Sequence, residues 1–137
     1  ISDLSTAEFV YNGIAEKYKD DNPEKEKYNI KYDASVKVGI NMNDIDFNID
    51  ISNKTITPIL PEIKINSISV DESSLSYIPK NPDMELNEIL DCCQIDAQNE
   101  ASNTDELYDT AKENLQTVVE ALLKPITDTK GYKIKWD

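Results

Sequence analysis

The stretch YNIKYDASVKVGI, residues 28–40, decides the fold of this chain. Its apolar side chains occupy every second position, with polar or charged side chains between them. A period of two places one face of a strand on a core and the other in water, as antiparallel sheets require. The stretch is long for one strand, so we expect a bend or bulge within it. The alternating residues are Tyr28, Ile30, Tyr32, Ala34, Val36, Val38 and Ile40.

The β pattern extends outward on both sides of this strand. Upstream, Gly13 lies in a stretch rich in strand formers, residues 4–18, and indicates a bulge or a close backbone approach. The charged stretch 20–27 contains Pro23 and is typical of an exposed connection. Downstream, the predicted strands are 45–51, 55–60 and 63–70, with turns at 41–44 and 52–54.

Two features predict departures from regular pairing in these downstream strands. Pro58 has no backbone N–H, so we expect its strand at a sheet edge or with an irregularity. The apolar residues of 63–70 change phase, which predicts a bulge near Asn66.

The last third of the chain has helical periodicity. Asp83 is a candidate cap for a helix from about Met84 onward. Asn103 with Glu106 three residues later predicts the start of a second helix, and Pro125 is expected to end it. The predicted apolar faces are Leu86, Ile89, Leu90, Cys93 and Ala97, then Leu107, Ala111, Leu115, Val118, Val119, Leu122 and Leu123.

Burial has to drive the second helix. Each large apolar residue contributes about 1.5–3 kcal/mol when buried, whereas local propensity contributes only tenths. The apolar sheet face is the one predicted surface large enough to receive it. Residues 132–136 alternate again and predict a closing strand. The sequence therefore predicts an α+β fold: a bent antiparallel β-sheet with a C-terminal helical segment packed on one face and a short final strand, forming a single domain over residues 1–137.

Composition excludes several function classes. The net charge is −13, and the chain contains neither histidine nor arginine. Without histidine there is no Ser–His–Asp or Cys–His pair, and the commonest zinc ligand is missing. Without arginine there is no bidentate clamp for phosphate. The negative charge makes nucleic acid and anionic membranes poor partners, and leaves cationic partners, divalent metal or simple solubility, the most frequent of the three.

An oxygen-rich stretch is a candidate calcium site. Its spacing lacks the central glycine and terminal glutamate of a calcium loop, and alternate members fall on the solvent face of a predicted strand. We therefore expect a solvated face there. The candidate ligands are Asn41, Asn43, Asp44, Asp46, Asn48 and Asp50.

The segment from Asp83 to Glu120 holds 11 acidic residues and one lysine, Lys112. Its helices would present an acidic outer surface, which could bind a basic partner or divalent ions. The favoured interpretation is that these helices show their polar side to water. A carboxylate pair could hydrolyse glycosides, but no acid stands in an apolar context that would raise its pKa.

Serine and cysteine chemistry has weak support. A disulfide between the adjacent Cys92 and Cys93 would close a strained ring, and the pair does not form a C-x-x-C motif. We therefore expect one cysteine to be packed in the core and the other to have no special role. The serines near Lys80 form no S-x-x-K pattern and predict a polar loop. The serines and cysteines concerned are Ser73, Ser74, Ser76, Cys92 and Cys93. Among the aromatic residues, Tyr11, Tyr28 and Tyr32 are expected at the edge of the core, and Trp136 is expected to pack as part of the last strand.

Four segments occur in an order that is typical of a known protein family: Tyr11-Asn12-Gly13-Ile14-Ala15-Glu16, Tyr32-Asp33, Val38-Gly39-Ile40-Asn41-Met42, and Ile56 to Leu60-Pro61. With the terminal helix and short strand, the chain resembles the bacterial domain-of-unknown-function family 4230 over nearly all its length. The family's usual Gly-Ile-Asp-Leu is Gly39-Ile40-Asn41-Met42 here, so an asparagine replaces the aspartate. The resemblance implies a membrane helix upstream and therefore an extracytoplasmic, membrane-tethered module. It supplies no catalytic residues to transfer.

The sequence therefore predicts no catalytic, cofactor-binding or metal-binding residues and no cofactor. The first functional hypothesis is a non-catalytic binding module that contacts a protein or envelope component, without nucleic acid, and meets the membrane only through the upstream anchor. The alternative is a carrier of a small apolar ligand between sheet and helices. A carboxylate-dependent hydrolase is the third and least favoured hypothesis.

Overall fold

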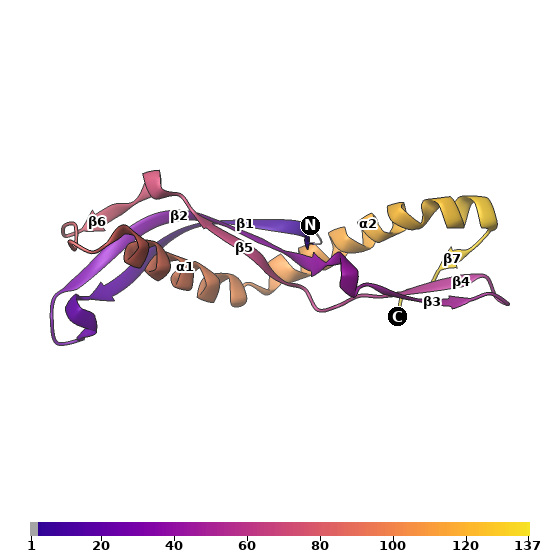
Figure 1. Ribbon diagram of the computed structural model, residues 1–137, viewed down its shortest axis with the longest axis horizontal. Coiled ribbons are helices and arrows are strands. Elements are labelled where there is room, and N and C mark those ends of the chain that lie inside the picture. Colours follow the sequence, from indigo (N-terminus) through magenta and orange to yellow (C-terminus); the bar gives the residue numbers. More distant parts are fainter. Residues whose placement is uncertain (1–2) are drawn as a thin grey trace. The chain divides into compact units, whose positions relative to one another are not determined.

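The computed structural model describes residues 3–137 and confirms the α+β class (Figure 1). Three single-turn 3-10 helices punctuate the first half, at Lys19–Asp21, Met42–Asp44 and Glu72–Ser74. None of the helices in the described residues is long and apolar enough to cross a membrane. The main elements are β1 (Asp3–Tyr18), β2 (Lys27–Asn41), β3 (Asp46–Asp50), β4 (Thr55–Ile59), β5 (Lys64–Val70), β6 (Ser76–Ile78), α1 (Leu86–Ser102), α2 (Asp105–Lys130) and β7 (Lys133–Ile134).

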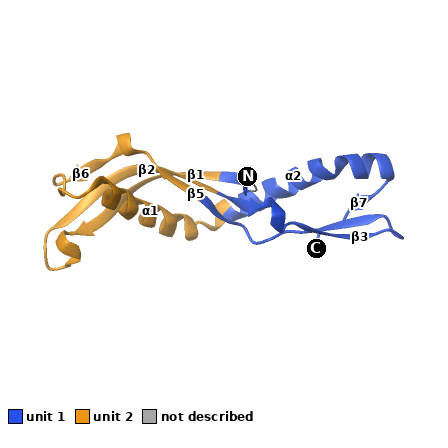
Figure 2. Cartoon of the chain, viewed as in Figure 1, with its two compact units in different colours: residues 1–7, 38–66, 108–137 blue, residues 8–37, 67–107 orange. Residues whose placement is uncertain are grey.

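The chain forms two compact units, shown in Figure 2. Unit 1 comprises residues 1–7, 38–66 and 108–137, and unit 2 comprises residues 8–37 and 67–107. The strands β1, β2 and β5 and the helix α2 each contribute residues to both units. The single domain expected from the sequence stays a prediction, which unfolding experiments can test.

Unit 2 is built on β2, whose period of two is confirmed. All seven alternating residues of this strand, Tyr28 to Ile40, are buried, and the last two belong to unit 1. In the larger sheet, β2 lies between β1 and β5, and its first part also pairs antiparallel with β6, with Ile30 opposite Tyr77. The helix α1 buries one stripe in unit 2, consisting of Ile89, Cys93, Ala97 and Ala101.

Gly13 is explained by a close approach inside unit 2. A Cβ at this position would lie 2.8 Å from the Cζ and hydroxyl oxygen of Tyr32. Only glycine leaves room for the two tyrosine rings that meet over this point of β1, since Tyr11 packs edge-on against Tyr32 with 5.9 Å between ring centroids. The sequence predicted a bulge or a close backbone approach at Gly13; the groups that approach its backbone are the side chains of Tyr11 and Tyr32.

Unit 1 is built around α2, which covers part of a three-stranded sheet with the order β3-β4-β7. The strand β4 pairs antiparallel with β3 and parallel with β7. The closing strand thus rejoins a sheet as predicted, but it is shorter than 132–136 and its pairing is parallel. The core of unit 1 consists of Ile40, Ile56, Leu115, Val119 and Leu123.

The helix boundaries differ from those predicted. Asp83 has a left-handed backbone with φ 55°, so it cannot act as an N-cap, and α1 begins at Leu86. Asn103 caps the end of α1, where its backbone N–H reaches the carbonyl of Glu100, and α2 begins two residues later. The last carbonyls of α1 need hydrogen-bond donors, and Asn103 supplies one. Asn103 therefore ends α1 and does not start α2.

Pro125 does not end α2, which continues to Lys130. The ring removes one backbone donor, but Ile126 packs on the core of unit 1 directly after it. Gly131 then takes a left-handed φ of 73°, the usual conformation just beyond a helix. Tertiary burial therefore carries the helix one turn past a local breaker.

Pro58 lies in the central strand of its sheet, which contradicts the predicted edge position. The short β7 pairs only with Thr55 and Ile56 of β4, so this side of β4 has no ladder partner at Pro58. A proline is tolerated there because no donor is required. Near Asn66, the adjacent Ile65 and Asn66 are both half-buried, which agrees with the predicted change of phase in β5.

Candidate functional site: an acidic cleft in unit 2

An open cleft of about 720 Å³ lies in unit 2 between the second half of β1 and the helix α1. Its walls come from segments that are at least 67 residues apart in the chain, as Asp21 and Glu88 show. The lining residues are Ile14, Ala15, Glu16, Lys17, Asp21, Glu88, Asp91, Cys92, Ile95, Asp96 and Asn99.

The spacing of the helix residues explains why they share one wall. Glu88, Cys92, Ile95 and Asn99 recur at intervals of three and four, which puts them on one side of α1. This side adjoins the buried stripe that contains Cys93. Packing of that stripe in unit 2 therefore turns the acidic side of α1 toward β1.

The charge in the cleft is strongly unbalanced. The lining contains carboxylates from Glu16, Asp21, Glu88, Asp91 and Asp96, against the single ammonium of Lys17. Lys17 forms an ion pair with Asp21, and this hydrogen bond raises the pKa of the lysine, which stays charged. Lys27 pairs with Glu16 at 2.8 Å. Among residues 3–137, no ion pair involves Glu88 or Asp91, which are both exposed.

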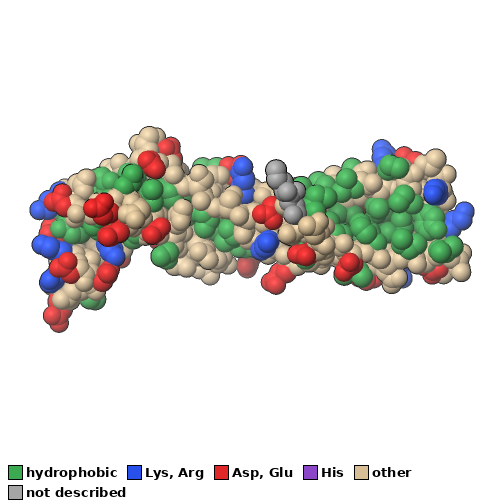
Figure 3. Space-filling view, in the orientation of Figure 1, with side chains coloured by type: hydrophobic (Ala, Val, Ile, Leu, Met, Phe, Trp, Pro, Cys, Tyr) green, Lys and Arg blue, Asp and Glu red, His purple; other side chains and the backbone are tan. Residues whose placement is uncertain are grey.

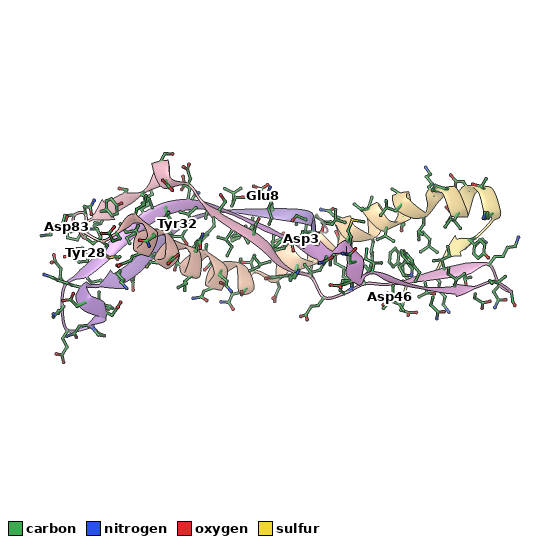
Figure 4. The ribbon with its side chains drawn as sticks, viewed as in Figure 1. Asp3, Glu8, Tyr28, Tyr32, Asp46 and Asp83 are labelled. Atoms are coloured by element: carbon green, nitrogen blue, oxygen red, sulfur yellow. The ribbon has the colours of Figure 1, made fainter. Side chains whose placement is uncertain are left out.

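A partly buried hydrogen bond fixes the inner wall of the cleft. Tyr32 of β2, labelled in Figure 4, is fully buried. Its hydroxyl donates to Oδ2 of Asp96 on α1 at 2.6 Å. Burial and then this bond raise the pKa of Tyr32 far above its ordinary value, so its hydroxyl remains a donor at physiological pH. The pair holds α1 against β2 and fixes the position of one cleft carboxylate.

The two cysteines are free thiols with little reactivity. Cys93 is buried, and burial raises its pKa to about 12. Burial also raises the pKa of Cys92, which lines the cleft and lies 3.7 Å from the carbonyl oxygen of Glu16. Because the thiolate is the nucleophile, neither side chain is activated for covalent catalysis at neutral pH.

The cleft can attract a cation with an aliphatic stem. Ile14 and Ile95 line it and are 52% and 60% exposed, so apolar surface adjoins the carboxylates. A lysine side chain has this combination of apolar stem and charged head. In the described part of the chain, no group of three or more His, Cys, Asp or Glu is arranged to hold a metal ion.

Two of the candidate calcium ligands, Asn41 and Asp50, serve local turns. Asn41 accepts a hydrogen bond from the N–H of Asn43 at 2.9 Å, and Asp50 accepts from the N–H of Asn53 at 3.0 Å. These are turn-type bonds that Asn and Asp commonly make with their own backbone. Asp46, labelled in Figure 4, lies on the exposed strand β3. Asn48 lies on the same strand.

The serines and the remaining aromatic residues also have structural roles. Ser74 Oγ accepts from the N–H of Asp33 at 2.8 Å, and Ser73 donates to Asp71 at 2.7 Å. Both serines belong to one 3-10 turn, in agreement with a polar loop. Among the aromatic residues, Tyr28 is buried and donates to Glu26, while Trp136 packs on the core of unit 1 and donates to Glu120.

Sequence reasoning identified only one wall of the cleft. The acidic segment from Asp83 onward supplied Glu88, Asp91 and Asp96, whereas Glu16, Lys17 and Asp21 were not singled out. No local motif marks the β1 residues, because their role depends on a tertiary contact with α1. The cluster of charges after Ile14 was the one available signal.

The fold and the cleft define an acidic α+β protein with an open, charged cleft. The family model described as "Protein of unknown function (DUF4230)" matches residues 1–134, so the chain belongs to that family. No curated protein and no solved structure matches the chain.

Proposed function

We propose that this protein is a non-catalytic binding module whose unit 2 cleft binds a cationic group of a protein or envelope component. The observation that supports this proposal most directly is the cleft itself: one lysine among several carboxylates, with two exposed isoleucines beside them. A ligand with lysine-like side chains would gain both charge attraction and apolar contact there.

The chemistry of the cleft favours binding over catalysis. Glu16, Asp21, Glu88 and Asp91 are exposed, whereas a general acid requires apolar surroundings that raise its pKa. The nearby thiols are held protonated by burial. The carrier and hydrolase hypotheses stay predictions, because no observation favours either one.

The proposal places the module outside the cytoplasmic membrane, tethered through an upstream anchor. Its support is the family resemblance set out from the sequence. Protease treatment of intact cells that produce the full-length protein tests this part: digestion of the domain is expected, and full protection until lysis would contradict it.

Binding to the cleft can be tested by calorimetry with oligolysine as the probe. The double variant Glu88→Gln/Asp91→Asn removes two exposed cleft carboxylates that have no lysine partner in the described residues. The matched control is Asp109→Asn/Glu113→Gln on α2, which changes the net charge equally in unit 1. We expect the cleft variant to weaken binding about tenfold, and the control to weaken it less than twofold.

Equal loss in both variants would contradict the cleft as the binding site, because attraction to net charge alone would then explain the result. Raising the ionic strength should weaken the specific binding as well, since exposed charges are screened within about 8 Å at physiological salt.

A further inference from the structure

The strand β3 in unit 1 is exposed along its whole length. Its single partner in the described residues is β4, so its other edge has no ladder partner. Such an edge presents backbone N–H and C=O groups that another strand can bind. Natural edge strands usually carry charged residues, prolines or covering elements that prevent pairing with another chain. In β3, only the polar face carries charged residues.

The opposite face of β3 is apolar and uncovered. Phe47 and Ile49 stand opposite Pro58 and Ile56 in the ladder, so all four point to the same side of the sheet. On that side, Ile56 packs against α2 and is 2% exposed, but Phe47 is 43% and Ile49 56% exposed. Figure 3 shows hydrophobic side chains gathered over this part of unit 1.

The polar face of β3 is acidic. Asp46, Asn48 and Asp50 alternate with the apolar residues and lie on the far side of the sheet from α2. A strand added at this edge would therefore place one set of side chains beside Phe47 and Ile49, and the other beside two carboxylates.

We propose that β3 is a docking edge for an extended segment of a partner protein that alternates lysine or arginine with apolar residues. Such a segment extends the β3-β4-β7 sheet, sets its apolar side chains beside Phe47 and Ile49, and places its cations beside Asp46 and Asp50. Backbone hydrogen bonds supply affinity, and the alternating pattern supplies specificity.

The same chemistry already occurs at the other edge of this sheet. Tyr132, Ile134 and Trp136 pack on the core of unit 1, with Lys133 and Lys135 between them. The backbone N–H groups of the two lysines donate to Lys54 and Ile56 at 2.9 and 2.8 Å. A basic alternating segment therefore fits an edge of this sheet in this chain.

Charge disfavours a second copy as the occupant of β3. Antiparallel pairing of two β3 strands sets aspartates near aspartates across the ladder, and like charges in that position are destabilising. Each copy also bears a net charge of −13. A basic partner avoids both penalties.

This inference rests on the proposed role as a binding module, but it concerns a surface separate from the cleft. The probe is a synthetic heptapeptide of alternating lysine and isoleucine, measured by calorimetry. The control is a peptide of the same composition with its lysines grouped together. The β3 variant is Asp46→Lys/Asn48→Lys, which leaves Asp50 in place because Asp50 accepts hydrogen bonds from Asn53. The Glu88→Gln/Asp91→Asn cleft variant serves as the second protein control.

We expect the alternating peptide to bind at least tenfold more tightly than the grouped one. The β3 variant should lose at least tenfold in affinity and instead bind a glutamate–isoleucine peptide, while the cleft variant keeps the original affinity. Circular dichroism of each variant establishes that it is folded.

Equal binding of both lysine peptides, or loss in the cleft variant alone, would overturn the β3 proposal while leaving the cleft proposal intact. Concentration-dependent dimers that the β3 variant abolishes would also overturn it, in favour of a second copy. Failure of oligolysine to discriminate the cleft variants would instead count against the proposed function and not against β3.

Discussion

Tyr32 shows how one residue links the core of unit 2 to its cleft. We expect Tyr32→Phe to lower the free energy of unfolding by about 1.5–3 kcal/mol, because the half-buried carboxylate of Asp96 loses a hydrogen bond. Urea unfolding measures the change. Tyr132→Phe, in unit 1, is the matched control and should cost less than about 0.5 kcal/mol. Equal effects of the two substitutions would contradict a special role for the pair.

The same residue predicts a dependence of stability on alkaline pH. Because the folded-state pKa of Tyr32 is raised, the unfolded chain loses this proton first, from its ordinary value of 10.0 upward. The unfolded state then binds fewer protons, so the stabilisation is complete below pH 10 and falls as the pH rises. Urea midpoints between about pH 8 and 11 should decline more steeply in the wild type than in Tyr32→Phe. Parallel declines would contradict the assignment.

Gly39 and Gly131 are needed for different reasons: Gly39 because there is no room for a side chain, and Gly131 because its φ is positive. A Cβ on Gly39 would overlap the carbonyl oxygen of Leu4 and would lie 2.8 Å from the Cα of Ser5; backbone atoms cannot move aside as a side chain can. Gly131 has open space around it but a φ of 73°. We expect Gly39→Ala to destabilise by about 3 kcal/mol or more, and Gly131→Ala by about 1–2 kcal/mol. Thermal melts check the order, and the reverse order would be inconsistent with it.

At the scale of elements, the isoleucines at 49 and 56 stand directly opposite each other in β3 and β4. Their exposures are 56% and 2%. Ile56→Ala should therefore cost about 2–5 kcal/mol, and Ile49→Ala less than about 1 kcal/mol. Urea unfolding of the two variants measures both values. A large cost at Ile49 would mean that β3 is covered in solution.

The contrast between β2 and β3 shows how far the alternation of apolar and polar residues can predict burial. Both strands alternate apolar and polar residues, and both were predicted as strands with one buried face. Burial followed for β2, whereas β3 is exposed on both faces. The alternation sets which side chains share a face, but α2 decides which face is covered, and it reaches β4 without covering β3.

At the scale of the whole molecule, the two units share their longest elements. Because β1, β2, β5 and α2 each contribute to both units, we expect a single cooperative unfolding transition. Fluorescence of Trp136, the one tryptophan, reports on unit 1, and labelling of the buried thiol of Cys93 reports on unit 2. Coincident urea midpoints are expected. Separate midpoints would show that the units unfold independently and would contradict the single domain predicted from the sequence.

The cleft shows how much of a candidate functional site can be predicted from this sequence. The excess of acids in the α1 region predicted an acidic surface, which the structure places beside β1. The wall from Glu16 to Asp21 could not be predicted, because strand and helix meet only in the folded chain. The absence of histidine and arginine, by contrast, limited the available chemistry before any fold was considered.

The sequence by itself determined the α+β class, the buried face of β2, most of the buried stripe of each helix and the acidic character of the chain. These are periodic or compositional properties, and each depends on near neighbours alone. Two residues of the predicted helix faces, Leu86 and Leu122, are instead 47% and 54% exposed, because the contact with the sheet is narrower than the apolar stripe. Only the tertiary structure decided the extension of α2 past Pro125, the parallel pairing of β7, the exposure of β3 and the position of the cleft. Each of these depends on contacts between distant segments, where the free energy of burial exceeds local preference.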